Sequence, residues 1–370
     1  MNNQAWYDIT NVDEVISPSL LIYPDRVEEN IRRMITLAGS PARLRPHIKT
    51  HKLPEIVRMQ LAQGITRFKC ATLAEAEMAA DAGAADVLLA YQPVGPNVER
   101  FVQLVKKFSG TKFSALVDNA FSLRAISASF AKAGVVADIL LDIDCGMHRS
   151  GIEAGPEAFA LYPLLCELPA VKAGGLHVYD GHISDTDVAA REQNCSTAFV
   201  PINAMRDELR RAGIPVPRIV AGGTPTFPIH AKNADVECSP GTCVLWDWGY
   251  SHELSDMDFL HAALVLTRVV SKPGGNRLCL DLGHKSIASE KPQPRVQFLS
   301  LPDAQAISHS EEHLVIESAR AQEIEVGACL YGVPRHVCPT VALYSEAVVV
   351  RDGRACERWK VTARERRLTI

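Results

Sequence analysis

The chain has 370 residues, of which 47% are hydrophobic and 22% are charged, and its formal net charge is −4. These values are typical of a globular protein, and the length allows one large domain or two. The composition argues against a nucleic-acid-binding protein, which normally carries a basic excess, and the apolar runs are far shorter than the ~20 residues that span a bilayer.

Short apolar runs alternate with helical patterns over the first two thirds of the chain. Eight runs are predicted as strands: residues 43–50, 67–72, 86–91, 113–118, 138–144, 174–179, 218–223 and 235–241. The amphipathic segments between them include residues 53–64, 73–84, 97–108 and 120–134, several of which end in glycine, the usual helix stop. Eight strands that alternate with helices over about 230 residues predict a (β/α)8 barrel of the TIM type. A doubly wound open sheet is the alternative.

The pattern changes after about residue 255. Residues 262–283 are predicted as two strands joined by a Pro-Gly-Gly turn, and the remaining chain continues in short strand-like runs. The sequence therefore predicts an α/β protein with a barrel over residues 16–252. A C-terminal, mainly β domain is predicted over residues 253–370, with residues 1–15 as a candidate additional segment of it.

Ten cysteines are spread from Cys70 to Cys356 without a C-x-x-C pair. Several lie inside apolar runs, which indicates small buried side chains in a reducing compartment. The N-terminal sequence shows no charged segment followed by an apolar one, so no secretory signal is expected and a cytoplasmic location is predicted.

The first predicted strand carries an unusual density of bases. Arg45, His47, Lys49, His51 and Lys52 lie within eight positions. Neighbouring positive charge and partial removal from water both favour a neutral lysine amine. At the carboxyl end of a barrel strand, where active sites of this fold lie, such a lysine is a candidate nucleophile. The alternative is a solvated basic turn.

Polar residues also follow four further predicted strands. The segments are DIDCGMHRSG (142–151), HVYDGH (177–182), AGGTPT (221–226) and CSPGT (238–242). Barrels commonly bind phosphate after the seventh and eighth strands, where glycines let the backbone approach an anion and threonine hydroxyls add donors. Because the carboxyl ends of barrel strands share one rim, these segments predict a single site there.

A candidate metal pair lies in the predicted β domain. His336 and Cys338, in PRHVCPT, are two residues apart, so in an extended segment both side chains would point to one face. An imidazole nitrogen and a thiolate sulfur together suit zinc. A bare His-x-Cys pair is nevertheless more often found without a metal.

In chain order, RPHIKTHK, DIDCGMHRSG, VYDGH, GGTPT, SPGT and the late HVC together resemble the D-threonine aldolase and D-serine dehydratase family. The resemblance covers nearly the whole chain. It implies a barrel of the alanine-racemase type that binds pyridoxal 5'-phosphate (PLP), followed by a β domain. It also implies homodimers with shared active sites, a small D-amino acid substrate, and no nucleic-acid or membrane partner.

The resemblance assigns roles to individual residues. Lys49 would form the Schiff base with PLP, Arg149 would hold the phenolic oxygen or the substrate carboxylate, and Tyr179 would pack near the ring. Ser239 stands where the family places the partner of the pyridine nitrogen, although a serine cannot supply a full charge there. The predicted cofactor-binding residues are His47, Lys49, Arg149, Tyr179, Gly222, Gly223, Thr224, Ser239, Gly241 and Thr242. The predicted catalytic residues are Lys49, Tyr179, Arg149 and His313 (in SEEHL), and the metal ligands are His336 and Cys338.

The implied activity is that of a PLP-dependent lyase that also uses a divalent metal, zinc or manganese. Retro-aldol cleavage of D-threonine-type substrates to glycine and an aldehyde is favoured by the overall resemblance. Cys338 favours the alternative, dehydration of D-serine or D-3-hydroxyaspartate to a keto acid and ammonia, because the dehydratases tend to pair His with Cys. An amino-acid racemase would leave this pair without a role, and a non-enzymatic PLP-binding protein would need no β domain.

Overall fold

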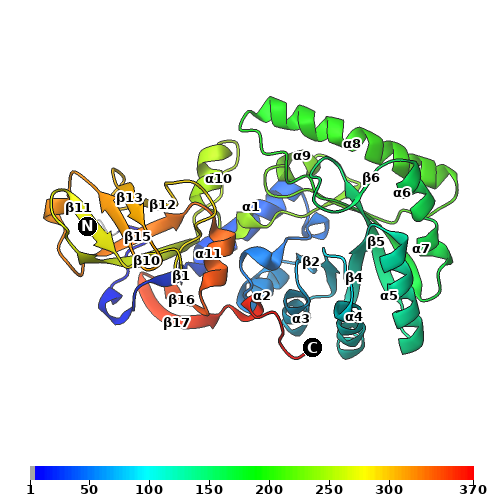
Figure 1. The fold of residues 1–370 in the computed structure, drawn as a ribbon, viewed down its shortest axis with the longest axis horizontal. Coiled ribbons are helices and arrows are strands. Elements are labelled where there is room, and N and C mark those ends of the chain that lie inside the picture. The colour runs from blue at the N-terminus through cyan, green and yellow to red at the C-terminus, as the bar shows by residue number, and fades with distance from the viewer. Residues whose placement is uncertain (1–4) are drawn as a thin grey trace. The chain divides into compact units, whose positions relative to one another are not determined.

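Two compact units make up the structure, a computed structural model that describes residues 5–370 (Figure 1). The first unit contains the residues up to Ile31, Thr50–Leu53 and Thr242–Arg364, and the second contains Arg32–Lys49, Pro54–Gly241 and Glu365–Ile370. The chain therefore passes from one unit to the other after residues 31, 49, 53, 241 and 364. The boundaries predicted at 16–252 and 253–370 stay a prediction.

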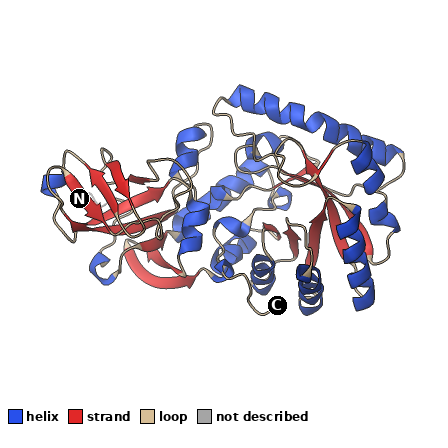
Figure 2. Ribbon diagram, in the orientation of Figure 1, coloured by secondary structure: helices blue, strands red, loops and turns tan. Residues whose placement is uncertain are grey.

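The second unit is built on a curled parallel sheet with helices beside its strands (Figure 2). The strand order is β2 (Arg67–Cys70), β3 (Asp86–Leu89), β4 (Lys112–Val117), β5 (Ala137–Asp144), β7 (Val171–Val178), β8 (Ile219–Ala221) and β9 (Val236–Cys238), with β6 (Ile152–Glu153) beside β5. The helices are α2 (Pro54–Ala62), α3 (Leu73–Asp81), α4 (Pro96–Lys107), α5 (Ala120–Ala133), α6 (Pro156–Leu161), α7 (Leu164–Glu167), α8 (Val188–Arg211) and α9 (Phe227–His230). Seven of the eight predicted barrel strands are thus confirmed, and the TIM-like class with them.

The remaining prediction, a regular strand over residues 43–50, is wrong. Only Leu44 and His47 form bridges, to Cys238 of β9 and Lys69 of β2, so the segment still joins the two edge strands of the sheet. Pro46 has no N–H for a ladder hydrogen bond, and the following residues turn into the 3₁₀ helix η3 (Ile48–Thr50). This segment occupies the place of the first strand without regular strand pairing.

The interior of the curled sheet separates apolar from polar side chains. Leu88, Leu116, Leu140 and Val220 from four strands form one buried cluster. Four buried polar residues lie near the carboxyl ends of the strands: Lys69, Asp142, His177 and Ser239. A group of buried polar side chains therefore lies at the rim where barrel active sites are found.

The first unit is built on a mainly antiparallel sheet. Its order is β13 (Gln305–His309), β14 (Leu314–Glu317), β11 (Arg277–Leu280), β10 (Ala263–Ser271), β1 (Ser19–Ile22), β16 (Glu346–Arg351) and β17 (Arg354–Lys360), while β15 (Cys329–Pro334) pairs with β10 and with β12 (Val296–Phe298). Helices α10 (Trp248–Glu253) and α11 (Val337–Leu343) accompany it, and α1 (Pro24–Ala38) runs across the division at Ile31. The C-terminal, mainly β domain is confirmed, including the β10–β11 pair around the Pro-Gly-Gly turn.

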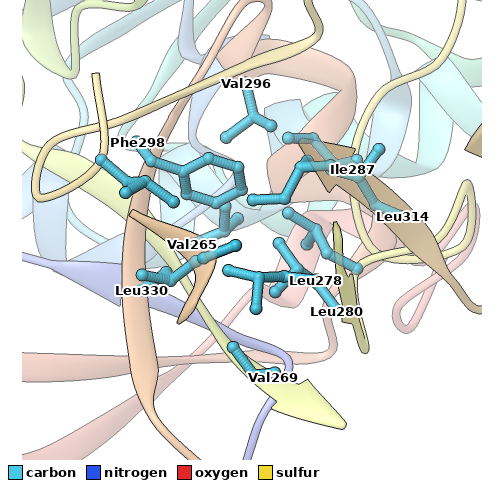
Figure 3. Packing of buried hydrophobic residues seen from close by; sticks show 13 residues of the cluster. Val265, Val269, Leu278, Leu280, Ile287, Val296, Phe298, Leu314 and Leu330 are labelled. Carbon is cyan, nitrogen blue, oxygen red and sulfur yellow. The ribbon is translucent and has the colours of Figure 1, made fainter. Parts of the chain in front are cut away.

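Strand β10 packs on both of its faces. Val265 and Val269 belong to the cluster shown in Figure 3, whereas Leu264 and Leu266 belong to a second cluster that includes Tyr331. Successive side chains of a strand point to opposite faces, so this alternation follows from the sequence. Residues of the segment before β1 also pack into the second cluster; residues 1–4 of that segment lie outside the described part.

Within residues 5–370, no helix is both long enough and apolar enough to cross a membrane. All ten cysteines have free thiols, and four of them are fully buried. The cysteines therefore act as small side chains in the packing or as reactive groups, not as cross-links.

Candidate active site

Lys49 lies in η3, directly after the segment that bridges β9 and β2. Its backbone N–H donates to Nδ1 of His47 at 3.4 Å. Its charge also acts on Lys69 of β2, whose pKa it helps to lower. The structure therefore brings two lysines together at the carboxyl end of the sheet.

Arg45 and His51 do not add positive charge to this place, which corrects the expected cluster of bases. The buried guanidinium of Arg45 lies 2.7 Å from both Asp86 Oδ1 and Glu237 Oε2, so its charge is balanced. In the first unit, burial lowers the pKa of His51 to about 3, so its ring is neutral at pH 7. Both partners of Arg45 are distant in sequence, which is why the pattern of bases did not reveal the pairing.

Lys69 is not among the residues that the sequence predicts for the site. Its side chain is fully buried, and Nζ donates to Ser239 Oγ at 2.6 Å and lies 3.4 Å from His177 Nε2. Burial, together with the nearby charge of Lys49, lowers the pKa of Lys69 to about 7. A buried lysine beside a predicted cofactor residue is a strong candidate for function.

His177 connects Lys69 to a buried carboxylate. His177 Nδ1 lies 2.7 Å from Asp142 Oδ1. The other oxygen of Asp142 accepts from Gln92 Nε2 at 2.8 Å and from Ser150 Oγ at 3.0 Å. Burial lowers the pKa of His177 despite this contact, so the ring is neutral, with Nδ1–H donating to Asp142 and Nε2 left to accept.

The two glycine-rich turns predicted to hold phosphate meet in the structure. Gly241 N–H donates to Thr224 Oγ1 at 3.2 Å. Gly222 has φ +77°, and a Cβ there would lie 2.5 Å from the nearest side-chain atom. A Cβ on Gly223 would lie 3.2 Å from the ring of Tyr179. A side chain is therefore excluded at Gly222 and would crowd the Tyr179 ring at Gly223, and such a backbone cradle fits a phosphate group.

Tyr179 and Arg149 also lie together at this rim, as predicted. The Arg149 guanidinium is 4.8 Å from the centroid of the Tyr179 ring, and Lys69 Nζ is 5.5 Å from the same centroid. Cations over an aromatic face are attracted to it, so the contacts hold these side chains in place. The residues of the second unit thus fit PLP: a lysine for the carbonyl carbon, cations for its oxygens and a cradle for its phosphate.

The metal pair lies in the first unit, at the start of α11. His336 is the N-cap residue and Cys338 is the second helical residue, so the expected extended segment is wrong. Pro339 is tolerated in the first turn because the first N–H groups of a helix have no partner within it. The two side chains still hydrogen bond to each other, which brings the predicted ligands together.

Glu290 contacts His336, and two threonine hydroxyls lie near Cys338. Glu290 Oε1 lies 2.5 Å from His336 Nδ1, and Cys338 Sγ lies 3.3 Å from Thr50 Oγ1 and 3.6 Å from Thr242 Oγ1. Burial would lower the pKa of His336, but the hydrogen bonds with Cys338 and Glu290 outweigh it and raise the pKa to about 9. A carboxylate on Nδ1 is the usual partner of a metal-binding histidine, since it leaves Nε2 for the ion. This donor set fits a zinc-like ion.

A second group that could hold a metal lies in the second unit. The ligand atoms of Asp180, Cys195 and His230 are all within 4.8 Å of one another, and all three residues are buried. Asp180 Oδ2 is 2.7 Å from His230 Nε2 and its Oδ1 accepts from Thr226 Oγ1 at 2.8 Å. Two ligands of a tetrahedral zinc ion would lie roughly 3.4 Å apart, which is farther than the 2.7 Å between Asp180 Oδ2 and His230 Nε2. In this structure the group is therefore held together by hydrogen bonds, and it contacts the GGTPT turn through Thr226.

The remaining predicted residues lie in the first unit. His313 is exposed in the turn between β13 and β14, where Ser310 N–H donates to its carbonyl oxygen at 2.9 Å. Thr242 begins the 3₁₀ helix η4 (Thr242–Val244) and contacts Cys338. Thr242 therefore lies with the metal pair, and the role of His313 stays a prediction.

Comparisons with known proteins agree over nearly the whole chain. Residues 22–246 match the alanine racemase N-terminal domain family, and residues 262–350 match a domain family named for serine dehydratase. The chain is 32% identical to D-threonine aldolase of Arthrobacter sp over 95% of its length and 93% of that protein. It is 26% identical to 3-hydroxy-D-aspartate aldolase of Paracoccus denitrificans over 95% and 92%. The solved structure of D-threonine aldolase from Filomicrobium marinum covers 97% of this chain and 98% of its own, at a TM-score of 0.89 and 28% identity.

Proposed function

The chain belongs to the alanine racemase N-terminal domain family and is a PLP-dependent lyase of that fold, and on this premise we propose that it cleaves D-β-hydroxy-α-amino acids to glycine and an aldehyde. The observation that carries the proposal is the meeting of His336 and Cys338, with Glu290 on the far nitrogen of the histidine. A racemase would need no metal at the substrate. The identity to D-threonine aldolase over nearly the full length favours carbon–carbon cleavage.

The residues of the second unit would bind and orient PLP. Lys49 would form the covalent link and give it up to the substrate amino group. The backbone of Gly222, Gly223 and Thr224 would hold the phosphate. Arg149 and Tyr179 would hold the oxygen-bearing edge and the ring. When bound, PLP supplies the electron sink that lyase chemistry at an amino acid requires.

The residues of the first unit would act on the substrate hydroxyl. His336 Nε2 and the Cys338 thiolate would hold the ion, and Glu290 would fix the histidine ring. A divalent ion there would lower the pKa of a bound hydroxyl, as it does for bound water. Thr50 and Thr242, whose hydroxyls lie near Cys338 Sγ, would orient the thiolate.

Dehydration is the second candidate reaction, and Cys338 is the observation that favours it. A thiolate is a softer ligand than the carboxylate expected of an aldolase, and it suits zinc better than manganese. D-Serine would then give pyruvate and ammonia. The residue set is nearly the same for both reactions, so the products decide between them.

We also propose a homodimer whose active sites include residues of the β domain of the partner subunit. The exposed position of His313 in the β13–β14 turn leaves it available to such a contact. Sedimentation velocity at the assay concentration should show a dimer. A fully active monomer would overturn this part of the proposal.

The test is a product assay on holoenzyme supplied with zinc or manganese. D-Threonine should give glycine and acetaldehyde in equal amounts, and D-serine should give little pyruvate. Pyruvate from D-serine without cleavage of D-threonine would transfer the assignment to the dehydratase. Interconversion of enantiomers without either product would return it to a racemase.

A further inference from the structure

The hydroxyl of Ser239 has no hydrogen to offer to a ligand. Ser239 Oγ lies 2.8 Å from Gly222 O and 3.1 Å from Ala221 O, two carbonyl oxygens that can only accept. Its single hydrogen is therefore directed to the backbone, and its lone pair accepts from Lys69 Nζ at 2.6 Å. Ser239 cannot at the same time donate to the nitrogen of a bound ring.

Lys69 has donors to spare at the same place. A charged lysine carries three N–H donors. One is used by Ser239, and a second lies within reach of His177 Nε2 at 3.4 Å. Within residues 5–370, no carboxylate forms an ion pair with Lys69, although its side chain is fully buried. In its charged form Lys69 therefore keeps a third donor in a buried position, where unused hydrogen-bonding groups are costly.

Resting on the proposed function, we propose that Lys69, and not Ser239, donates the hydrogen bond to the pyridine nitrogen of PLP. The lone pair of an unprotonated pyridine nitrogen is the acceptor that the spare N–H lacks. His177, held by Asp142 with its Nε2 as an acceptor, fixes the position of the ammonium group. Lys69 thus supplies from β2 the donor that the serine after β9 cannot supply.

The surroundings of Lys69 decide the protonation state of the ring nitrogen. A carboxylate beside that nitrogen would hold it as a pyridinium, whereas a cationic donor keeps it unprotonated. Both oxygens of Asp142 are engaged in hydrogen bonds, with His177, Gln92 and Ser150. The lowered pKa of Lys69 agrees with a site that disfavours additional positive charge. We therefore expect a ring with moderate electron-withdrawing power.

The test uses PLP labelled with ¹⁵N at the ring position and bound to the full chain. The wild-type ¹⁵N resonance should lie between those of free and protonated pyridine, as for a hydrogen-bonded nitrogen. Lys69→Met should move it towards the free, unbonded position and weaken PLP binding about tenfold. Lys69→Gln retains an N–H donor and should keep most of the wild-type shift. Ser239→Ala is the matched control and should change the resonance less than Lys69→Met does, because it removes an acceptor of Lys69 but leaves the donor.

Three outcomes would overturn the inference. These are a wild-type resonance at the pyridinium position, an unchanged resonance in Lys69→Met, and a change in Ser239→Ala that Lys69→Met does not show. If Lys69→Met does not fold, the wild-type resonance and Lys69→Gln still decide. Failure of the proposed function would look different, because PLP would then not bind to Lys49 or no lyase product would form.

Discussion

Arg45 and Asp86 form a buried ion pair in which Nη1 lies 2.7 Å from Oδ1. The Nε of the same guanidinium lies 2.7 Å from Glu237 Oε2. Arg45 belongs to the irregular segment that replaces the first barrel strand, whereas its partners lie on β3 and β9. The pairs therefore tie the segment before Lys49 to the sheet where regular strand pairing is missing.

Loss of the two ion pairs of Arg45 should strongly destabilise the protein. Arg45→Met keeps much of the side-chain volume but leaves two carboxylates without their buried partner, which typically costs about 3–5 kcal/mol. We expect the unfolding midpoint of the protein to fall by roughly 10 °C in a thermal scan. Arg67→Met is the matched control, because Arg67 pairs with the same Glu237 at 2.9 Å but is 39% exposed. It should cost about 0–1 kcal/mol. Equal effects of the two variants would contradict the structural role of Arg45.

The link to PLP should depend on Lys49 alone. Lys49→Ala should abolish both the absorption near 420 nm that is typical of lysine-bound PLP and the lysine adduct trapped by borohydride. Lys52→Asn is the control. Lys52 has φ +55°, a conformation that asparagine tolerates, so the backbone should be preserved and the adduct retained. A borohydride-trapped adduct in Lys49→Ala, located by peptide mass spectrometry, would assign the link to another lysine such as Lys69.

Removal of the metal should separate chemistry from cofactor binding. Chelation should abolish lyase activity while the 420 nm absorption persists, because the PLP-binding residues do not include the metal pair. Cys338→Ala should behave in the same way, since His336 alone is a weak site. Cys338→Asp should restore a two-ligand site that favours manganese over zinc. Cys356→Ala, at an exposed thiol of the same unit, should keep full activity. Full activity of thoroughly chelated enzyme would reject the metal mechanism.

Acid should destabilise the first unit through His51. Its folded-state pKa is about 3, against about 6.5 when unfolded, so between these values the unfolded chain binds more protons. Above pH 6.5 His51 does not change the free energy of unfolding with pH. Below pH 6.5 it lowers the free energy of unfolding by about 1.4 kcal/mol per pH unit. His51→Asn keeps an acceptor for Leu53 N–H, which donates to His51 Nδ1 at 3.1 Å. The unfolding midpoint of this variant should fall less steeply from pH 6.5 to 4.5 than that of the wild type. The same pH dependence of the unfolding midpoint in both proteins would show that protonation of His51 does not destabilise the fold.

Local patterns were sufficient to predict most of the fold. Helices α2 to α5 and the strands between them follow from amphipathic spacing, apolar runs and terminal glycines. The segment around Pro46 was assigned to a strand because its neighbours are strand-like, while its actual pairing depends on contacts with β9 and β2. The N-terminus of α11 was missed because a helix of seven residues leaves little periodicity to detect.

The candidate site could be predicted only where motifs mark it. The glycine turns, Lys49 and the His336–Cys338 pair have recognisable spacing. Lys69 lies between buried Phe68 and Cys70 on a strand that is buried on both faces, so alternation does not distinguish it from a solvent-facing lysine. Glu290 reaches His336 from 46 positions away, a contact that only the folded chain reveals.

The repeated passage of the chain between its two units has a consequence for inheritance and engineering. Neither unit is encoded by one continuous stretch: the second needs the last six residues, Glu365–Ile370, and the first needs the four-residue piece Thr50–Leu53. Arg100 Nη2, for example, donates to the backbone oxygen of Ile370 at 2.9 Å. A single genetic crossover therefore cannot exchange either unit as a module, and a gene truncated after residue 241 would yield two incomplete cores.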